Sequence, residues 1–147
     1  MTRRHGDWAK LSRMAIEKLQ AALAGYFVPW VQALELRVGQ AGGDGVRVRL
    51  PQRAQLARAA GLVCGRAMMA AADTCRVLAL MQHRGRIQTV HQGAGEFRLS
   101  QAAGGTGWFA QTRLLRAGKP PAFGEIAIRG ANDQRSVCRA TTIHALL

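Results

Sequence analysis

The sequence predicts an α+β fold in which one antiparallel sheet wraps around a long central helix. Two observations favour this fold. The segment 61–82 is apolar around nearly its whole circumference and contains one acid, Asp73, and a helix of that kind must be covered on every face. Most of the remaining chain alternates between apolar and polar residues in short stretches that end at turn residues. Because such short connections join antiparallel strands, we expect a single domain with one sheet.

The N-terminal residues 8–25 have the pattern of an amphipathic helix. Apolar residues recur there at helical spacing, while lysine, arginine and glutamate fall on the other side. A glycine and a proline end this helix, and a short helical or irregular piece is expected at 28–33. The chain is therefore divided into an N-terminal helical extension, 1–26, and a main domain, 27–147.

Strands are expected where apolar and polar residues alternate. Residues 34–38 and 46–50 flank a turn at 42–45, which is typical of a hairpin with one buried face and arginines on the other. Four further strands are expected after the central helix, at 87–99, 106–117, 122–129 and 134–145.

The sequence indicates a cytoplasmic protein without a membrane anchor. Arg66, Asp73 and Arg76 interrupt the longest apolar stretch, which leaves it short of the roughly 18 residues that a spanning helix needs. The first ten residues lack the apolar core of a secretory signal. The three cysteines are scattered and form no metal-ligand spacing with the histidines, so we expect reduced thiols and neither a metal nor a bound cofactor.

The formal net charge of +13 at pH 7 is the strongest feature of the composition. Such a charge favours polyanionic partners, among them nucleic acid, anionic lipid and phosphate-bearing ligands. The arginines are spread from Arg3 to Arg139 without a basic run, and aromatic residues for base stacking are scarce. An arginine-rich background from a GC-rich genome explains the charge equally well. We therefore do not expect nucleic acid as a partner.

Several residues in and after the central segment stand at the spacing of a motif: Gly61, Gly65, Asp73-Thr74 and Thr89-Val90. Together with the order of elements, they resemble the signature of the phenylacetyl-CoA thioesterase type of hotdog-fold acyl-CoA thioesterases. The resemblance covers about residues 27–147. It implies a hotdog fold, hydrolysis of a thioester, and a homodimer or a dimer of dimers (homotetramer), with the N-terminal helix as an addition.

The chain departs from this signature at three positions. Arg58 stands where the family has asparagine, Cys64 where it has histidine, and Arg66 where it has a second glycine. The acid and the first of the two adjacent glycines are retained.

The retained residues suit thioester hydrolysis. Gly65 lies near a helix N-terminus, where unpaired N–H groups and the positive end of the dipole stabilise an oxyanion. Asp73 is expected to activate water as a general base or to attack as a nucleophile, with Thr89 orienting the acid or the water. A structural acid bonded to Thr89 or to a nearby arginine is the alternative interpretation of Asp73, and close packing is the alternative for Gly65.

The spacing of Gly65 and Asp73 predicts a site shared between subunits. Eight residues of helix span about 12 Å along the axis, so the two residues cannot reach one reacting carbon from the same chain. We expect Gly65 of one chain to act with Asp73 of another across antiparallel helices.

Five residues are expected to contact the acyl-CoA substrate. Cys64 is interpreted as a small buried side chain beside the site, and Met69 either lines an adaptable acyl pocket or belongs to the core. Arg66 either reaches a CoA phosphate or pairs with the acid of the other chain. The resemblance places the nucleotide end of CoA near Arg98 and Arg116, whose guanidinium groups suit phosphate, although solvated strand faces explain these two equally well.

These observations together favour an acyl-CoA thioesterase that needs no cofactor beyond the CoA of its substrate. One alternative is a hotdog dimer that binds acyl-CoA without hydrolysing it, because the asparagine and histidine of the motif are replaced. The other is a basic nucleic-acid-binding protein.

Overall fold

The computed structural model describes residues 16–42, 45–57, 62–84, 90–99, 107–116, 122–130 and 136–146. A helical segment at 16–25 comes first. The elements that follow are α2 (Pro29–Gln32), β1 (Arg37–Gly42), β2 (Gly45–Leu50), the 3-10 turn η1 (Ala54–Leu56), α3 (Gly65–Arg84), β3 (Val90–Leu99), β4 (Trp108–Arg116), β5 (Ala122–Gly130) and β6 (Ser136–Leu146). This order is the one that the sequence predicts.

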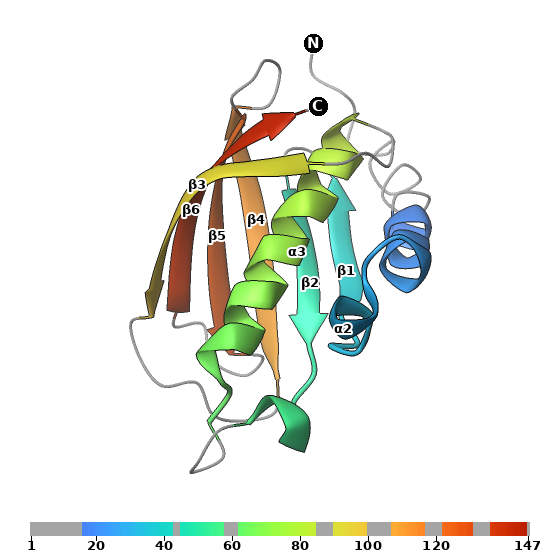
Figure 1. The fold of residues 1–147 in the computed structure, drawn as a ribbon, viewed down its shortest axis with the longest axis vertical. Coiled ribbons are helices and arrows are strands. Elements are labelled where there is room, and N and C mark those ends of the chain that lie inside the picture. The colour runs from blue at the N-terminus through green and yellow to red at the C-terminus, as the bar shows by residue number, and fades with distance from the viewer. Residues whose placement is uncertain are drawn as a thin grey trace.

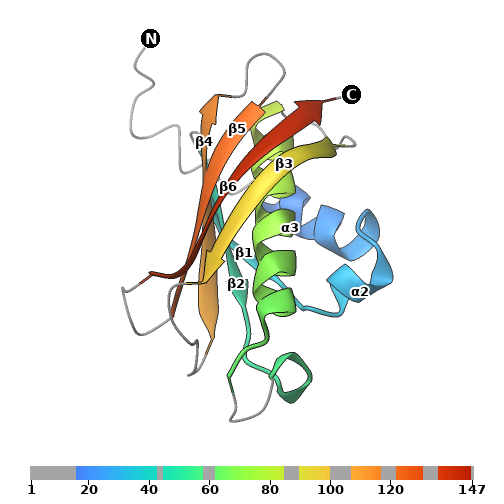
Figure 2. The ribbon, with the colours of Figure 1, turned by 60° about the vertical axis from the view of Figure 1, so that its left-hand side comes forward.

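The six strands form one antiparallel sheet in the order β1-β2-β4-β5-β6-β3. Figure 1 shows α3 lying across this sheet, and in Figure 2 all the labelled helices lie on the same side of it, while the sheet curves around α3. The prediction of an antiparallel sheet wrapped around a central helix is confirmed. The opposite face of the sheet carries no described helix.

Alternation along the strands determines which face each residue occupies. In β2, Val46, Val48 and Leu50 are buried against α3, whereas Arg47 and Arg49 lie on the other face. The predicted hairpin is therefore present, but its first strand begins at Arg37 instead of residue 34. The chain is still turning after α2 at that point, because the N–H of Glu35 donates to a carbonyl three residues earlier and Glu35 has a φ of 53°.

Helix α3 begins later than predicted, at Gly65 instead of residue 61. Val63 pairs with Ala57 in an isolated β-bridge, and the N–H of Cys64 donates to the Leu56 carbonyl over 2.7 Å. These contacts hold the preceding residues in an extended conformation, so the helix cannot include them. Helix α3 continues to Arg84, two residues beyond the predicted end.

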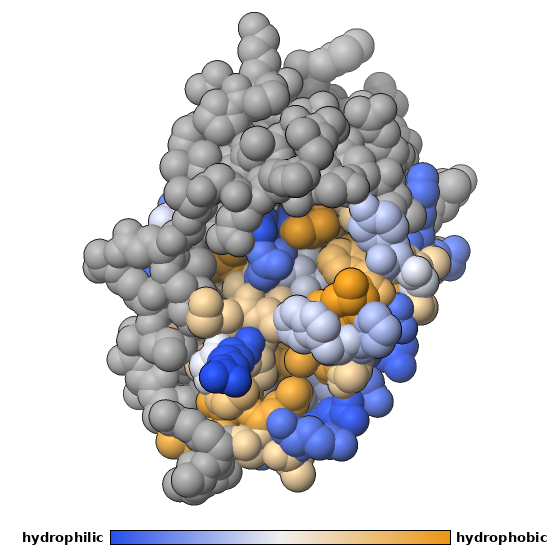
Figure 3. All heavy atoms as spheres, in the orientation of Figure 1, coloured by the Kyte–Doolittle hydropathy of each residue, from blue (hydrophilic) through white to orange (hydrophobic). Residues whose placement is uncertain are grey.

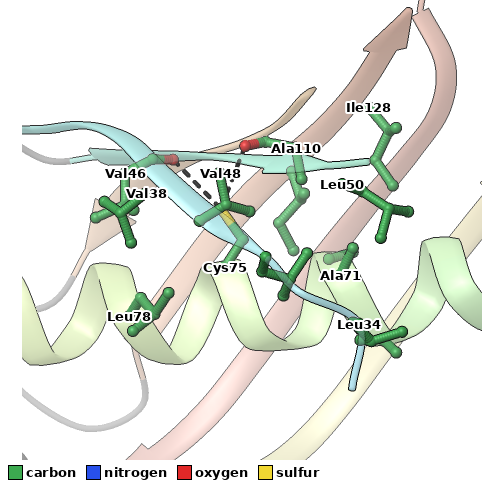
Figure 4. Close-up of a cluster of buried hydrophobic side chains, with 14 of the residues drawn as sticks. Leu34, Val38, Val46, Val48, Leu50, Ala71, Cys75, Leu78, Ala110 and Ile128 are labelled. Atoms are coloured by element: carbon green, nitrogen blue, oxygen red, sulfur yellow. Dashed lines mark hydrogen bonds between the residues drawn. The ribbon is translucent and has the colours of Figure 1, made fainter. Parts of the chain in front are cut away.

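The core lies between α3 and the sheet, mainly against β2 and β4. Small residues of α3, such as Ala71, let the helix approach the strands closely (Figure 4). Cys75 is fully buried there, and its thiol donates to the carbonyls of Val46 (3.3 Å) and Ala110 (3.4 Å). Burial raises the pKa of the Cys75 thiol to about 11, so this sulfur is a packing group and a poor nucleophile.

The helical segment 16–25 packs into the same core. Leu19 and Leu23 are buried in it. The Gln20 side chain donates to the Leu36 carbonyl (3.2 Å) and accepts from the Val38 N–H (2.9 Å), which fixes the segment to the beginning of β1. Within the described part of the chain, no helix is both long and apolar enough to cross a membrane.

Candidate functional site

One stripe of α3 is exposed on the helix side of the molecule. Arg66, Met69 and Asp73 follow one another at helical spacing and are all exposed, and half-buried Val77 continues the row. The expectation that α3 is covered on every face is wrong for a single chain. The sheet covers the opposite side of α3, and nothing among the described residues covers this one. Figure 3, seen from the helix side, shows hydrophobic and hydrophilic side chains side by side.

Asp73 is bonded to an arginine one turn further along the helix. The Nη2 group of Arg76 donates to Oδ1 of Asp73. The Arg76 side chain is 4% exposed and that of Asp73 is 53% exposed. The exposed carboxylate therefore neutralises a buried cation. Burial lowers the pKa of Arg76, and the charge of Asp73 works in the opposite direction.

The predicted partners of Asp73 include a nearby arginine, and the structure identifies it as Arg76. The signal that identifies it is the i, i+3 spacing of an acid and a base on one helix, which brings two such side chains together. The burial of Arg76 has no such signal, because it depends on which side of α3 the sheet covers.

Arg76 is not fully satisfied by this pair. Its Nε is buried and has no hydrogen-bond partner among the residues that the structure describes. An unpaired buried donor is destabilising by about 1–3 kcal/mol. Arg76 therefore depends on Asp73 as its one acceptor among the described residues.

The N-terminus of α3 is capped by a cysteine. The N–H of Ala67 contacts the sulfur of Cys64 at 3.4 Å, and the Cys64 carbonyl accepts from Ala67 and Met68. The Cys64 side chain is half-buried at the position before the first helical residue. The N–H of Gly65 donates to no described residue. This group is therefore available to an external acceptor, as an oxyanion donor must be.

Gly65 and Asp73 both belong to α3, but one chain does not bring them together. Eight helical residues separate them by about 12 Å along the axis, as the sequence predicts. Among the described residues, no group of three histidine, cysteine or acidic side chains is arranged to hold a metal ion.

The other predicted site residues are placed only in part. Thr89 lies outside the described residues, as does Arg58. Arg98 is in β3 and Arg116 is in β4, and their side chains are outside the described set. Arg113, near Arg116, lies on the face of the sheet away from α3, where its guanidinium is 3.4 Å from Glu125.

Comparison with known proteins identifies the fold. No family model matches the chain, and no curated protein matches it by sequence. Three solved structures show the similarity. The PaaI protein of the phenylacetic acid degradation operon of E. coli has a TM-score of 0.78 and 16% identity, over 93% of this chain and 96% of that one. A thioesterase from Haemophilus influenzae has a TM-score of 0.79 and 17% identity, over 90% of both chains. A thioesterase variant from Pseudomonas aeruginosa has a TM-score of 0.76 and 14% identity, over 90% of this chain and 93% of that one.

These matches span nearly the whole of each chain. The chain therefore shares the fold of these thioesterase structures, which is the hotdog fold that its sequence motif predicts.

Proposed function

We propose that this hotdog-fold protein is an acyl-CoA thioesterase that hydrolyses its substrate at a site between two subunits. The observation that carries the proposal is helix α3, whose Gly65 N–H has no partner among the described residues and whose exposed stripe carries the ion-paired Asp73. The thioesterase structures with the same fold support it.

The proposed reaction is hydrolysis by one water molecule. Asp73 takes a proton from the water, whose oxygen attacks the thioester carbonyl carbon. The carbonyl oxygen becomes an oxyanion that accepts a hydrogen bond from the Gly65 N–H at the positive end of α3. The carbon–sulfur bond then breaks, and the proton is returned to the CoA thiolate. The products are a carboxylic acid and CoA.

A dimer can bring Gly65 and Asp73 close together, although they are far apart within one chain. If the α3 helices of two copies lie antiparallel with their exposed stripes together, the offset of about 12 Å along one helix is cancelled by the reversed direction of the other. Gly65 of one copy is then beside Asp73 of its partner, and symmetry produces two such sites. The exposure of this stripe of α3 in a single chain agrees with such a dimer.

Arg76 has a positioning role in this proposal. Its buried guanidinium donates to the Asp73 carboxylate and fixes it in one orientation. Because Arg76 approaches from the core, the outer carboxylate oxygen stays open to the solvent side.

Exposed residues of the same stripe are suited to substrate contacts. Met69 is 52% exposed, and its flexible side chain adapts to acyl groups of different shape. Arg66 is exposed at the beginning of α3, where its guanidinium is free to pair with a phosphate of CoA.

A panel of aryl-CoA and fatty acyl-CoA thioesters, assayed by release of free thiol, tests the proposal. Asp73→Asn is expected to lose at least 100-fold in kcat. Glu35→Gln is the matched control, because it neutralises another exposed carboxylate that pairs with an arginine, Arg53. The control should keep wild-type activity. Turnover that survives in Asp73→Asn, or a wild-type protein that neither binds nor hydrolyses any thioester, would refute the proposal.

The second candidate function is acyl-CoA binding without hydrolysis. It is favoured by the same ion pair, because a carboxylate that serves to neutralise buried Arg76 can be purely structural. Calorimetric binding of a thioester by the wild-type protein, without any release of thiol, would support this second function over the first.

A further inference from the structure

The face of the sheet away from α3 carries a concentration of arginine that the proposed hydrolysis does not use. On each strand, the residues that alternate with core residues lie on this face. Glu125 is the one acid among those whose side chains are described. Six of these outward-facing residues are arginines: Arg37, Arg47, Arg49, Arg113, Arg129 and Arg139. We call the surface that they form the arginine face.

The helix side has a different balance of charge. The described charged side chains there are four bases and three acids: Lys18, Arg53, Arg66, Arg76, Glu17, Glu35 and Asp73. An arginine-rich background would distribute positive charge over both sides. The described charges are instead strongly asymmetric, with six bases and one acid on the outer side of the sheet.

The strand register brings these arginines close to one another. Arg37 of β1 lies directly opposite Arg49 of β2. Arg49 in turn lies opposite Phe109 of β4, and Phe109 lies opposite Arg129 of β5. Like charges directly opposite each other destabilise a sheet. An anion that contacts both guanidinium groups removes this repulsion.

Few acids neutralise the arginine face. Arg113 is paired with Glu125 at 3.4 Å, and both side chains are at least half exposed. The remaining five arginines have no acidic partner among the described residues. The outer side of the sheet therefore presents cations that ligand phosphates can satisfy.

We propose that the arginine face binds the phosphate backbone of duplex nucleic acid without reading its sequence. Neighbouring strands are about 4.8 Å apart and alternate residues of a strand about 6.8 Å apart, so several guanidinium groups reach phosphates on one side of a duplex. Arginine forks are suited to phosphate oxygens, and phosphate contacts carry no sequence information.

The remaining chemistry of the face favours a duplex over a single strand or a membrane. The Phe109 ring is covered by the Arg47 guanidinium, 4.0 Å from the ring centroid, so it is not open to stacking with an unpaired base. Among the side chains that the structure describes, the large apolar ones that are exposed, and that an anionic bilayer would take up, lie outside the sheet: Tyr26, Val28, Trp30 and Met69.

Fluorescence anisotropy of a labelled 20-base-pair DNA duplex, titrated with the full chain, tests the proposal. If five arginines each neutralise one phosphate, the slope of log K against log salt is about −4.5, and affinity falls about 500-fold between 50 and 200 mM salt. The variant Arg37→Gln/Arg49→Gln is expected to reduce this slope by about 1.8 and to weaken binding at least tenfold at 100 mM salt. The matched control Lys18→Gln/Arg53→Gln removes the same charge from the helix side and should change the Kd less than threefold.

Three results would overturn the proposal. One is the absence of duplex binding at 50 mM salt. Another is an equal loss of affinity in both double variants, which would assign binding to net charge alone. The third is binding to vesicles of anionic lipid that depends on Arg37 and Arg49, without duplex binding. If the first variant does not fold, as judged by circular dichroism, Arg129→Gln/Arg139→Gln takes its place. Thioester hydrolysis does not enter this test.

Discussion

Arg76 and Asp73 are joined across one turn of α3, although the arginine is buried and the acid is exposed. The pair links the core of the protein to the surface stripe on which we place the chemistry. Substitutions of Arg76 and of Asp73 should therefore change activity and the free energy of unfolding in different ways. Comparing the two distinguishes a role in catalysis from a role in stability.

Replacing Arg76 by methionine is expected to lower activity without lowering stability. Removal of a buried guanidinium with an unpaired Nε is neutral or stabilising when the replacement fills the space, and Asp73 remains solvated. Without its partner the carboxylate loses its fixed orientation, so kcat should fall about tenfold with KM little changed. Steady-state kinetics and thermal unfolding of the same preparation check this. A parallel loss of Tm and kcat would show that Arg76 is merely structural.

Replacing Asp73 by asparagine should have a stability cost that Arg76→Met does not have. The substitution leaves the buried guanidinium without a charged acceptor, and we expect a loss of about 1–3 kcal/mol in the free energy of unfolding. Urea denaturation measures it. In the double variant Asp73→Asn/Arg76→Met, most of this loss should be recovered, because no buried cation remains. A double variant as unstable as Asp73→Asn alone would contradict the coupling.

Gly65→Pro tests the oxyanion donor without removing the helix. Proline is tolerated at the first helical position, but it has no N–H. We expect kcat to fall about 100-fold or more, the range seen when one oxyanion donor is lost. The control is Gly65→Ala, which keeps the N–H and adds one methyl group. If Gly65→Pro were as active as Gly65→Ala at equal Tm, the Gly65 N–H would have no part in the reaction.

Co-expression of Asp73→Asn and Gly65→Pro chains tests whether the site is shared. In a mixed dimer, one site receives the intact glycine of one chain and the intact acid of the other. Random assembly of equal amounts makes half the dimers mixed, and each has one working site of two, so about a quarter of wild-type activity should return. A site confined to one chain would give no recovery on mixing.

Alkaline pH should destabilise the protein through its buried thiol. Burial raises the pKa of Cys75 from 9.0 to about 11, so the folded state keeps the proton longer than the unfolded state. The stability gained from the neutral thiol is complete below pH 9 and is lost as pH rises toward 11, by up to about 3 kcal/mol. Urea denaturation in the presence of a reductant, for the wild-type protein and Cys75→Ala, measures the difference. Identical pH dependence of the two would contradict this origin.

The sequence predicts the elements well because their signals are local. Alternation in β2 and the apolar composition of α3 both depend on neighbouring residues, and the order of elements follows directly. The errors occur where a distant partner decides. The pairing of Val63 with Ala57 delays the start of α3, and the turn at Glu35 delays β1.

The candidate site is predictable in part for the same reason. Asp73 is conspicuous as the one acid in an apolar segment, and the glycine pattern identifies Gly65. The exposure of Asp73 and the burial of Arg76 are not local properties. They follow from the rotation of α3 against the sheet, which the sequence of the helix alone does not determine.

The alternation of β2 also limits how this chain can change in length. Its buried valines face α3 and its arginines face outward, so a single inserted residue would exchange the two sets and place guanidinium groups in the core. Two inserted residues would keep every later side chain on its own face. Insertions within β2 are therefore expected to be tolerated in pairs and rejected singly, unless a bulge absorbs the extra residue.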